Sequence, residues 1–142
     1  MLKKLNKKGF TLAELLIVVA IIGVLVAISI PIFTAQLKKA HLATNQANAR
    51  AAYAATVAKM LEEEKTSGRY TYTVSTAKLE KVGTGDSTGE GDTTASPNDW
   101  SYDTSTSSTA SWKNEDLGTK TAVSWTVDIA GDGTIKYKVN WT

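Results

Sequence analysis

The sequence predicts an α+β protein in which one long N-terminal helix packs on a small antiparallel β-sheet. Three observations support this fold class. An apolar run covers residues 10–33, small apolar residues continue at helical spacing to about residue 65, and two alternating segments near the C-terminus flank a glycine-rich turn. The first half of the helix should be transmembrane and the second half amphipathic. At 142 residues, the chain has room for a single domain.

The apolar run is long enough to cross a bilayer. Phe10 to Phe33 are 24 residues with one charge, Glu14, and as a helix they would extend about 36 Å against a hydrocarbon core of about 30 Å. Four lysines and no acid precede the run. This bias places the N-terminus in the cytoplasm and the residues after Phe33 outside.

Glu14 is the unusual residue of this helix. An unpaired carboxylate within a membrane helix costs several kcal/mol, on scales that differ, and is normally a functional residue with a partner. The alternative is an interfacial glutamate whose side chain reaches the headgroups. The sequence offers a partner if a protease cuts after Gly9, because the basic leader is then lost and a new α-amine forms at Phe10.

An ordinary secretory signal peptide fits the segment poorly. Such a signal has a short apolar region followed by a small-residue cleavage site, whereas here the small residue, Gly9, precedes a long run. The stretch K-K-G-F-T-L-A-E-L-L, followed by about twenty apolar residues, resembles the class III signal of type IV pilins and type II secretion pseudopilins. The resemblance covers roughly residues 7–40.

The resemblance implies a fold, a set of site residues and a set of partners. The fold would be the pilin fold. A prepilin peptidase would cleave between Gly9 and Phe10 and N-methylate the Phe10 amine, and Glu14 of an incoming subunit would pair with the Phe10 amine of its neighbour. Further partners would be other pilin subunits in a homopolymer, the pilus assembly platform and its ATPases.

Two residues are expected to weaken the apolar helix. Gly23 is a poor helix former, and Pro31 lacks an amide donor and clashes with the carbonyl of Ala27. In related pilins the equivalent region loses helicity in the filament. The alternative is that both residues reflect the general enrichment of Gly and Pro in membrane helices.

The predicted organisation is a leader at 1–9, a transmembrane and assembly helix at 10–33, an amphipathic helix at 34–65 and a globular head at 66–142. The net charge of +2 comes from the leader, because removing its four lysines leaves 12 basic and 14 acidic residues, a charge of −2. Nucleic-acid binding is therefore not predicted. The chain has no cysteine, which departs from the disulfide common in Gram-negative pilins and favours a Gram-positive-like source.

An alanine-rich stripe is expected to place the amphipathic helix on the sheet. Gly68 is a candidate stop for this helix, and fraying is expected at its end, where three glutamates face the negative end of the helix dipole. The stripe recurs at spacings of three and four and consists of Leu37, Ala40, Leu42, Ala43, Ala47, Ala51, Ala54, Ala55, Ala58 and Leu61.

The remaining chain predicts strands around a long loop. Residues 69–75 alternate as a strand, 76–82 suit a short helical turn, and 83–111 have loop composition, with Trp100 and Trp112 expected to fold back on the head. Residues 122–129 and 134–141 predict a hairpin. Its apolar side would cover the helix, and its polar side would face water: Ser124, Thr126, Asp128, Lys136, Lys138 and Asn140.

The sequence contains no convincing catalytic, cofactor or metal site. It has one histidine, no cysteine and no phosphate-binding glycine loop. The acids of the long loop, Asp86, Glu90, Asp92 and Asp99, fit no calcium-loop template, and the run from Asp128 to Gly133 suits turn chemistry better than a metal loop. An enzyme is not predicted.

The sequence favours a type IV pilin, inserted in the membrane as a single-pass precursor and assembled through its N-terminal helix into an extracellular pilus. A pseudopilin of a type II secretion or DNA-uptake system would share every motif. A binding module held by an uncleaved anchor helix is a third interpretation, and it leaves Glu14 without a partner. Adhesion and twitching motility are roles that the sequence does not distinguish.

Overall fold

The computed structural model describes residues 9, 11–83, 93–102, 112 and 114–142. The chain divides into two compact units, Met1–Gln36 and Leu37–Thr142. The first long element, α1 (Leu12–Glu62), continues from one unit into the other as an unbroken helix. The expected helix is therefore present, about three residues shorter at its C-terminal end than predicted.

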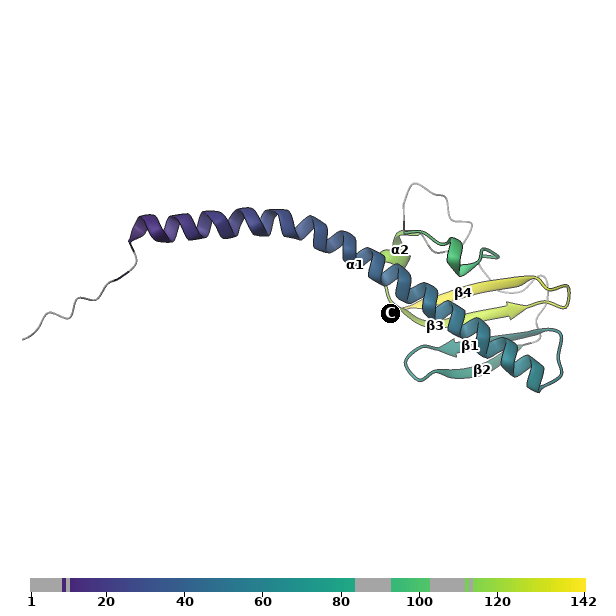
Figure 1. The fold of residues 1–142 in the computed structure, drawn as a ribbon. Helices are drawn as coiled ribbons and strands as arrows, with labels where there is room; N and C mark the ends of the chain where they lie inside the picture. The colour runs from purple at the N-terminus through teal and green to yellow at the C-terminus, as the bar shows by residue number, and fades with distance from the viewer. Residues whose placement is uncertain (1–8, 10, 84–92, 103–111, 113) are drawn as a thin grey trace, which may run out of the picture. The chain divides into compact units, whose positions relative to one another are not determined.

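The second unit, called the head here, is a four-stranded antiparallel sheet with the order β2-β1-β3-β4 (Figure 1). The strands are β1 (Gly68–Thr73), β2 (Lys78–Gly83), β3 (Ala122–Ile129) and β4 (Ile135–Trp141). A 3₁₀ turn, η1 (Pro97–Asp99), and a short helix, α2 (Asn114–Thr119), lie between β2 and β3. The α+β fold class predicted from the sequence is confirmed.

The core of the head lies between the second half of α1 and one face of the sheet. Trp125 is fully buried in β3, and its ring stacks on that of Trp100 with the centroids 5.0 Å apart. Trp112 meets Trp100 edge to face at 5.3 Å. Trp100 and Trp112 therefore do fold back on the head, as predicted, and both are less than 10% exposed.

The face that α1 turns to the sheet differs from the predicted stripe. Most of the predicted alanines, such as Ala47 and Ala54, are exposed, and Leu61 is 72% exposed. Alanine is a strong helix former on any face, so its spacing carried little information about which side is buried. The buried face instead consists of small and hydrogen-bonding residues: Asn45, Ala49, Ala52, Thr56 and Met60.

Asn45 explains why this face is buried. Its Nδ2 donates to the carbonyl oxygens of Leu117 (2.9 Å) and Lys120 (3.0 Å), and its Oδ1 accepts from the amide of Ala122 (3.3 Å). A buried amide with all these partners stabilises one rotation of the helix, because any other rotation would leave polar groups unpaired. Asn45 thereby joins α1 to the end of α2 and the start of β3.

The C-terminal end of α1 is ordered by side chains and by the backbone. Glu64 adopts a left-handed conformation with φ 52°, and the amide of Lys65 donates to the carbonyl of Met60 at 2.9 Å. Glu62 pairs with Lys59 at 3.0 Å. The helix therefore ends before Gly68, which begins β1, and its acidic end is partly neutralised by lysine.

Residues 76–82 do not form the short helical turn that the sequence predicts. The structure instead makes β2 the partner of β1, with Tyr72 opposite Leu79, after a turn in which Ala77 has φ 51°. β1 has an open edge, and pairing it satisfies backbone groups that a single helical turn would leave exposed. The short helix α2 was not predicted at all.

The C-terminal hairpin is confirmed, with Trp125 opposite Val139. Its turn uses the predicted chemistry, since Asp132 Oδ1 accepts from the Thr134 amide at 2.9 Å and Gly133 has φ 88°. One register detail differs. A bulge after Ala122 leaves Val123 39% exposed, although an inward position was predicted.

The polar side of β3 does not face water as predicted, because Ser124, Thr126 and Asp128 are all less than 10% exposed. β3 is a central strand, and side chains of its neighbours cover it. The pairs are Arg69 Nη2 with Asp128 Oδ2 at 3.0 Å, Thr71 Oγ1 with Thr126 Oγ1 at 2.8 Å, and Asn140 Nδ2 with Ser124 Oγ at 3.0 Å.

Part of the long loop predicted at 83–111 is described. Thr93 forms a bridge with Tyr137 of β4, with the Tyr137 amide donating to the Thr93 carbonyl at 2.9 Å. The Gln46 side chain donates to the carbonyl of Trp100 at 3.2 Å, which ties this segment to α1. The acids Asp86, Glu90 and Asp92 lie outside the described residues, and so do residues 103–111 of the predicted loop.

Candidate functional site

The N-terminus of α1 carries the predicted site, and its geometry is a reciprocal capping box. The Thr11 amide donates to Glu14 Oε2 at 2.9 Å, and the Glu14 amide donates to Thr11 Oγ1 at 3.2 Å. Four amides at a helix start lack intrahelical partners, and this pair satisfies two donors there. The spacing Thr-x-x-Glu is the sequence signal of such a box, and the cap could have been predicted from it.

Glu14 keeps one oxygen available in this arrangement. Its side chain is exposed, and within the described part of the chain Oε1 has no hydrogen-bond or ion-pair partner. Glu14 therefore has a structural role as a cap and can still accept a hydrogen bond or pair with a cation from outside the helix. Capping accounts for Oε2 and leaves Oε1 without a partner among the described residues.

The apolar surface after Glu14 is uncovered. In the first unit, every described residue of α1 is exposed, including Leu16, Ile22 and Phe33. By length and composition, α1 is apolar enough to cross a membrane. Such a surface requires lipid or other apolar helices around it.

The other predicted site residues are placed as follows. Gly9 is exposed, and a Cβ atom at this position would meet nothing within 4 Å. Phe10, the predicted site of methylation and of pairing with Glu14, lies outside the described residues. Gly23 and Pro31 both lie within continuous helix, and a Cβ atom at Gly23 would also meet open space. Loss of helicity between them in a filament stays a prediction.

The described residues give no candidate metal centre. Across 9, 11–83, 93–102, 112 and 114–142, no three His, Asp or Glu side chains gather closely enough to hold an ion. Asp132 instead accepts from the backbone of its own turn, which lowers its pKa through the hydrogen bonds of Thr134.

Comparison with known families identifies the class of the N-terminal segment. Residues 4–30 match the family described as the prokaryotic N-terminal methylation motif. The match contains Gly9, the capping box and Gly23, on a helix able to span a membrane. In this N-terminal segment the chain is similar to proteins that carry the N-terminal methylation motif.

A relative carries the comparison further. The chain is 49% identical over 53 residues to the type IV narrow pilus major component PilA5 of Thermus thermophilus. The matched stretch is 35% of this chain and 46% of that protein, so it spans less than half of the relative. No solved structure matches the chain. The similarity to the pilus component is thus limited to one part of the chain.

Proposed function

We propose that this protein is a structural subunit of a type IV pilus, inserted as a precursor, cleaved after Gly9 and assembled through α1 into an extracellular filament. The observation that supports this most is Glu14, which caps its own helix through Oε2 and keeps Oε1 available at the start of an uncovered apolar helix. A partner cation there would offset the cost of a carboxylate in an apolar environment. The Phe10 amine of a neighbouring subunit would supply that cation.

The exposed surfaces of α1 suit helix–helix packing in such a filament. The first unit offers large aliphatic side chains, which would exchange lipid contacts for contacts with other helices. In the head, the outer face of α1 offers small residues that permit close approach, among them Ala47, Ala51 and Ala54. The proposed partners are other copies of the chain, the prepilin peptidase, and the pilus assembly platform with its ATPases.

The test separates the capping role of Glu14 from its charge. Gln can replace Glu in a capping box, so Glu14→Gln should keep the hydrogen bond to Thr11 while losing the negative charge. Thr11→Val is the matched opposite, since it removes the capping hydroxyl, worth about 1 kcal/mol, and keeps the charge. Both variants would be expressed in cells, and the protein recovered in sheared filaments would be quantified.

We expect Glu14→Gln to be processed and absent from filaments, and Thr11→Val to be present in them. The reverse pattern would show that capping, and not charge pairing, is the reason for Glu14. Mass spectrometry of the N-terminus should find a methylated Phe10. Gly9→Leu should block this processing without disturbing the fold, because the position borders open space.

The same measurements distinguish the other candidate functions. A pseudopilin of a secretion or DNA-uptake system would begin at a processed Phe10 and never be recovered outside the cell envelope. A binding module held only by an anchor helix would keep Met1 as its first residue, form no polymer and be indifferent to Glu14→Gln. Either result would replace the pilus proposal.

A further inference from the structure

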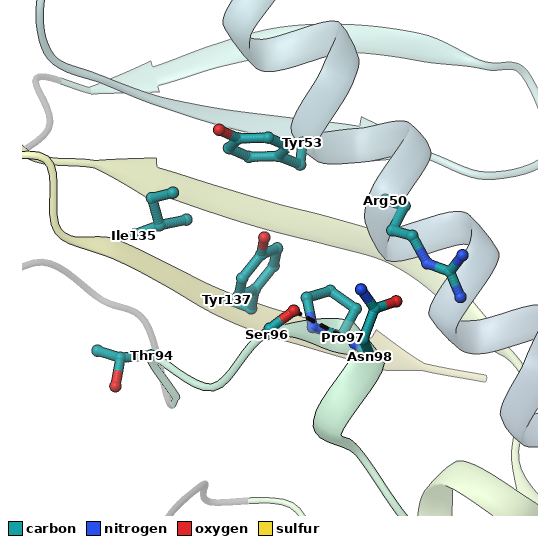
Figure 2. A pocket seen from close by; sticks show the side chains of 8 residues that line it. All are labelled: Arg50, Tyr53, Thr94, Ser96, Pro97, Asn98, Ile135 and Tyr137. Carbon is teal, nitrogen blue, oxygen red and sulfur yellow. Dashed lines mark hydrogen bonds between the residues drawn. The ribbon is translucent and has the colours of Figure 1, made fainter.

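A hollow on the head, separate from the N-terminal site, has the features of a small-ligand site. It lies between α1, β4 and the segment around η1, and its volume is about 330 Å³ (Figure 2). Arg50 and Tyr53 come from α1, Ser96 and Asn98 from the η1 segment, and Tyr137 from β4. This volume is in the lower range of pockets that hold small molecules.

Tyr137 places a polar group at the base of this hollow. The residue is 5% exposed, and its ring meets Trp100 edge to face at 5.7 Å, so its position is set by the core. Its hydroxyl has no hydrogen-bond partner among the residues that the structure describes. Its hydroxyl is protonated at neutral pH, as in any tyrosine, and can donate; burial raises the pKa of Tyr137 further, to about 12.

Arg50 determines the charge of the hollow. It is exposed on the outer turn of α1, and none of the described acids lies within ion-pair distance of it. The lining contains this one cation and no carboxylate. A guanidinium prefers planar anions that it can bind with two parallel hydrogen bonds. A single cation suits a monoanionic carboxylate better than a phosphate, which carries up to two charges.

The rest of the lining is neutral and partly apolar. Asn98 and Tyr53 offer an amide and a hydroxyl, while Pro97, Ile135 and the faces of the tyrosine rings offer apolar surface. Small-molecule sites typically have a mostly apolar lining with a small number of polar groups that point toward the ligand. Hydroxyl groups of a ligand would pair with the amide and phenols, and its C–H faces would pack against the rings.

We infer that this hollow binds a small ligand that carries one carboxylate and several hydroxyl groups, the chemistry of a uronic acid sugar. Arg50 holds the carboxylate, and the Tyr137 hydroxyl donates to a ligand oxygen. Such a ligand could be a free acidic sugar or the end of an acidic polysaccharide.

The experiment uses the full chain in detergent micelles and titrates it with galacturonic acid by isothermal calorimetry. We expect saturable binding with a dissociation constant at or below about 1 mM. Galactose, which lacks the carboxylate, should bind at least about tenfold more weakly. Short oligogalacturonides form a second arm, and they should bind more tightly than the monomer if a polysaccharide is the natural source and no more tightly if a free sugar is.

Three variants test the roles of the side chains. Arg50→Gln should weaken binding by about tenfold or more, and Tyr137→Phe by about threefold, because it removes only the hydroxyl and keeps the ring in the core. Lys39→Gln removes one positive charge from an exposed position of the same helix outside the hollow, and it should stay within about twofold of the parent. Near-ultraviolet circular dichroism of the tryptophan core checks that each variant is folded.

The inference would be overturned if no saturable binding appeared at galacturonic acid concentrations up to about ten times the expected dissociation constant. It would also be overturned if Arg50→Gln bound galacturonic acid as tightly as the parent does. Equal binding of galactose and galacturonic acid would also overturn it, since the carboxylate would then have no role. None of these results depends on filament formation, so they are separate from the test of the proposed function.

Discussion

The two halves of α1 have different surroundings. Residues 12–36 bury no side chain, whereas residues 37–62 bury five against the sheet of the head. The first half has backbone hydrogen bonds and a capping box to support it, and the second half has Asn45 and the aromatic core. The difference teaches that one helix can be divided by function, with one half contributing to the folding of the head and the other left for lipid or partner helices.

The largest expected effect is a loss of stability in the head, where α1 packs on the aromatic core. Trp125→Ala would empty a fully buried site at the centre of the tryptophan cluster and should lower the free energy of unfolding of the head by about 3–5 kcal/mol. Ile21→Ala, in the exposed half of α1, should change it by less than about 0.5 kcal/mol. Both would be measured by denaturant titration with tryptophan fluorescence, using the full chain in micelles. A comparable loss in Ile21→Ala would contradict the division of the helix.

A second, smaller effect tests what holds the helix rotation. Asn45→Ala should cost about 2–3 kcal/mol, because it leaves two carbonyls and one amide at the α2–β3 junction without partners. Asn48→Ala is the matched control, since Asn48 is only half-buried and makes no hydrogen bond to the described residues. Denaturant titration would again provide the values. Equal costs for the two variants would mean that the Asn45 side chain does not determine which face is buried.

The smallest expected effect lies at the C-terminal end of α1. The Lys65 ammonium and the Tyr70 hydroxyl, at 2.9 and 3.0 Å from Glu63 Oε2, lower the pKa of Glu63 below its ordinary 4.5. A folded-state pKa below the unfolded value means that this interaction stabilises the head above about pH 4.5 and is lost as the pH falls through the folded pKa. NMR titration of the Glu63 carboxyl carbon in the parent and in Tyr70→Phe measures it.

In Tyr70→Phe we expect the pKa of Glu63 to rise toward 4.5, because one hydrogen bond to the charged carboxylate is gone. Lys65→Met should raise it further, since the lysine is the larger cause. A pKa that is the same in parent and Tyr70→Phe would show that the hydroxyl contributes nothing at this end of the helix.

Local chemistry made much of the fold predictable. The hairpin followed from alternation and from Asp132 and Gly133, and the long helix followed from composition and spacing. The burial of Trp100 and Trp112 followed from their size within a polar segment. Each of these signals is contained in a few neighbouring residues, and so a single sequence can display it.

The errors arose where long-range partners decide. The rotation of α1 depends on contacts of Asn45 with residues more than 70 positions later in the sequence. The burial of Asp128 depends on Arg69, which lies in the adjacent strand but 59 positions earlier in the sequence. β2 forms because β1 has an open edge, which the sequence of residues 76–82 does not reveal. At the candidate site, the capping role of Glu14 could have been recognised from Thr11. A partner for Glu14 Oε1 could not, because none lies among the described residues.

The two edge strands of the sheet, β2 and β4, are protected against pairing with strands of other molecules. An unpaired strand edge is a template for β-pairing between molecules. β2 presents Lys78, Glu80 and Lys81 as exposed charges, and the Thr93 bridge covers part of the β4 edge. In the proposed filament, these features would discourage neighbouring heads from joining sheet to sheet, so that subunits would associate through their helices without competing amyloid-like growth.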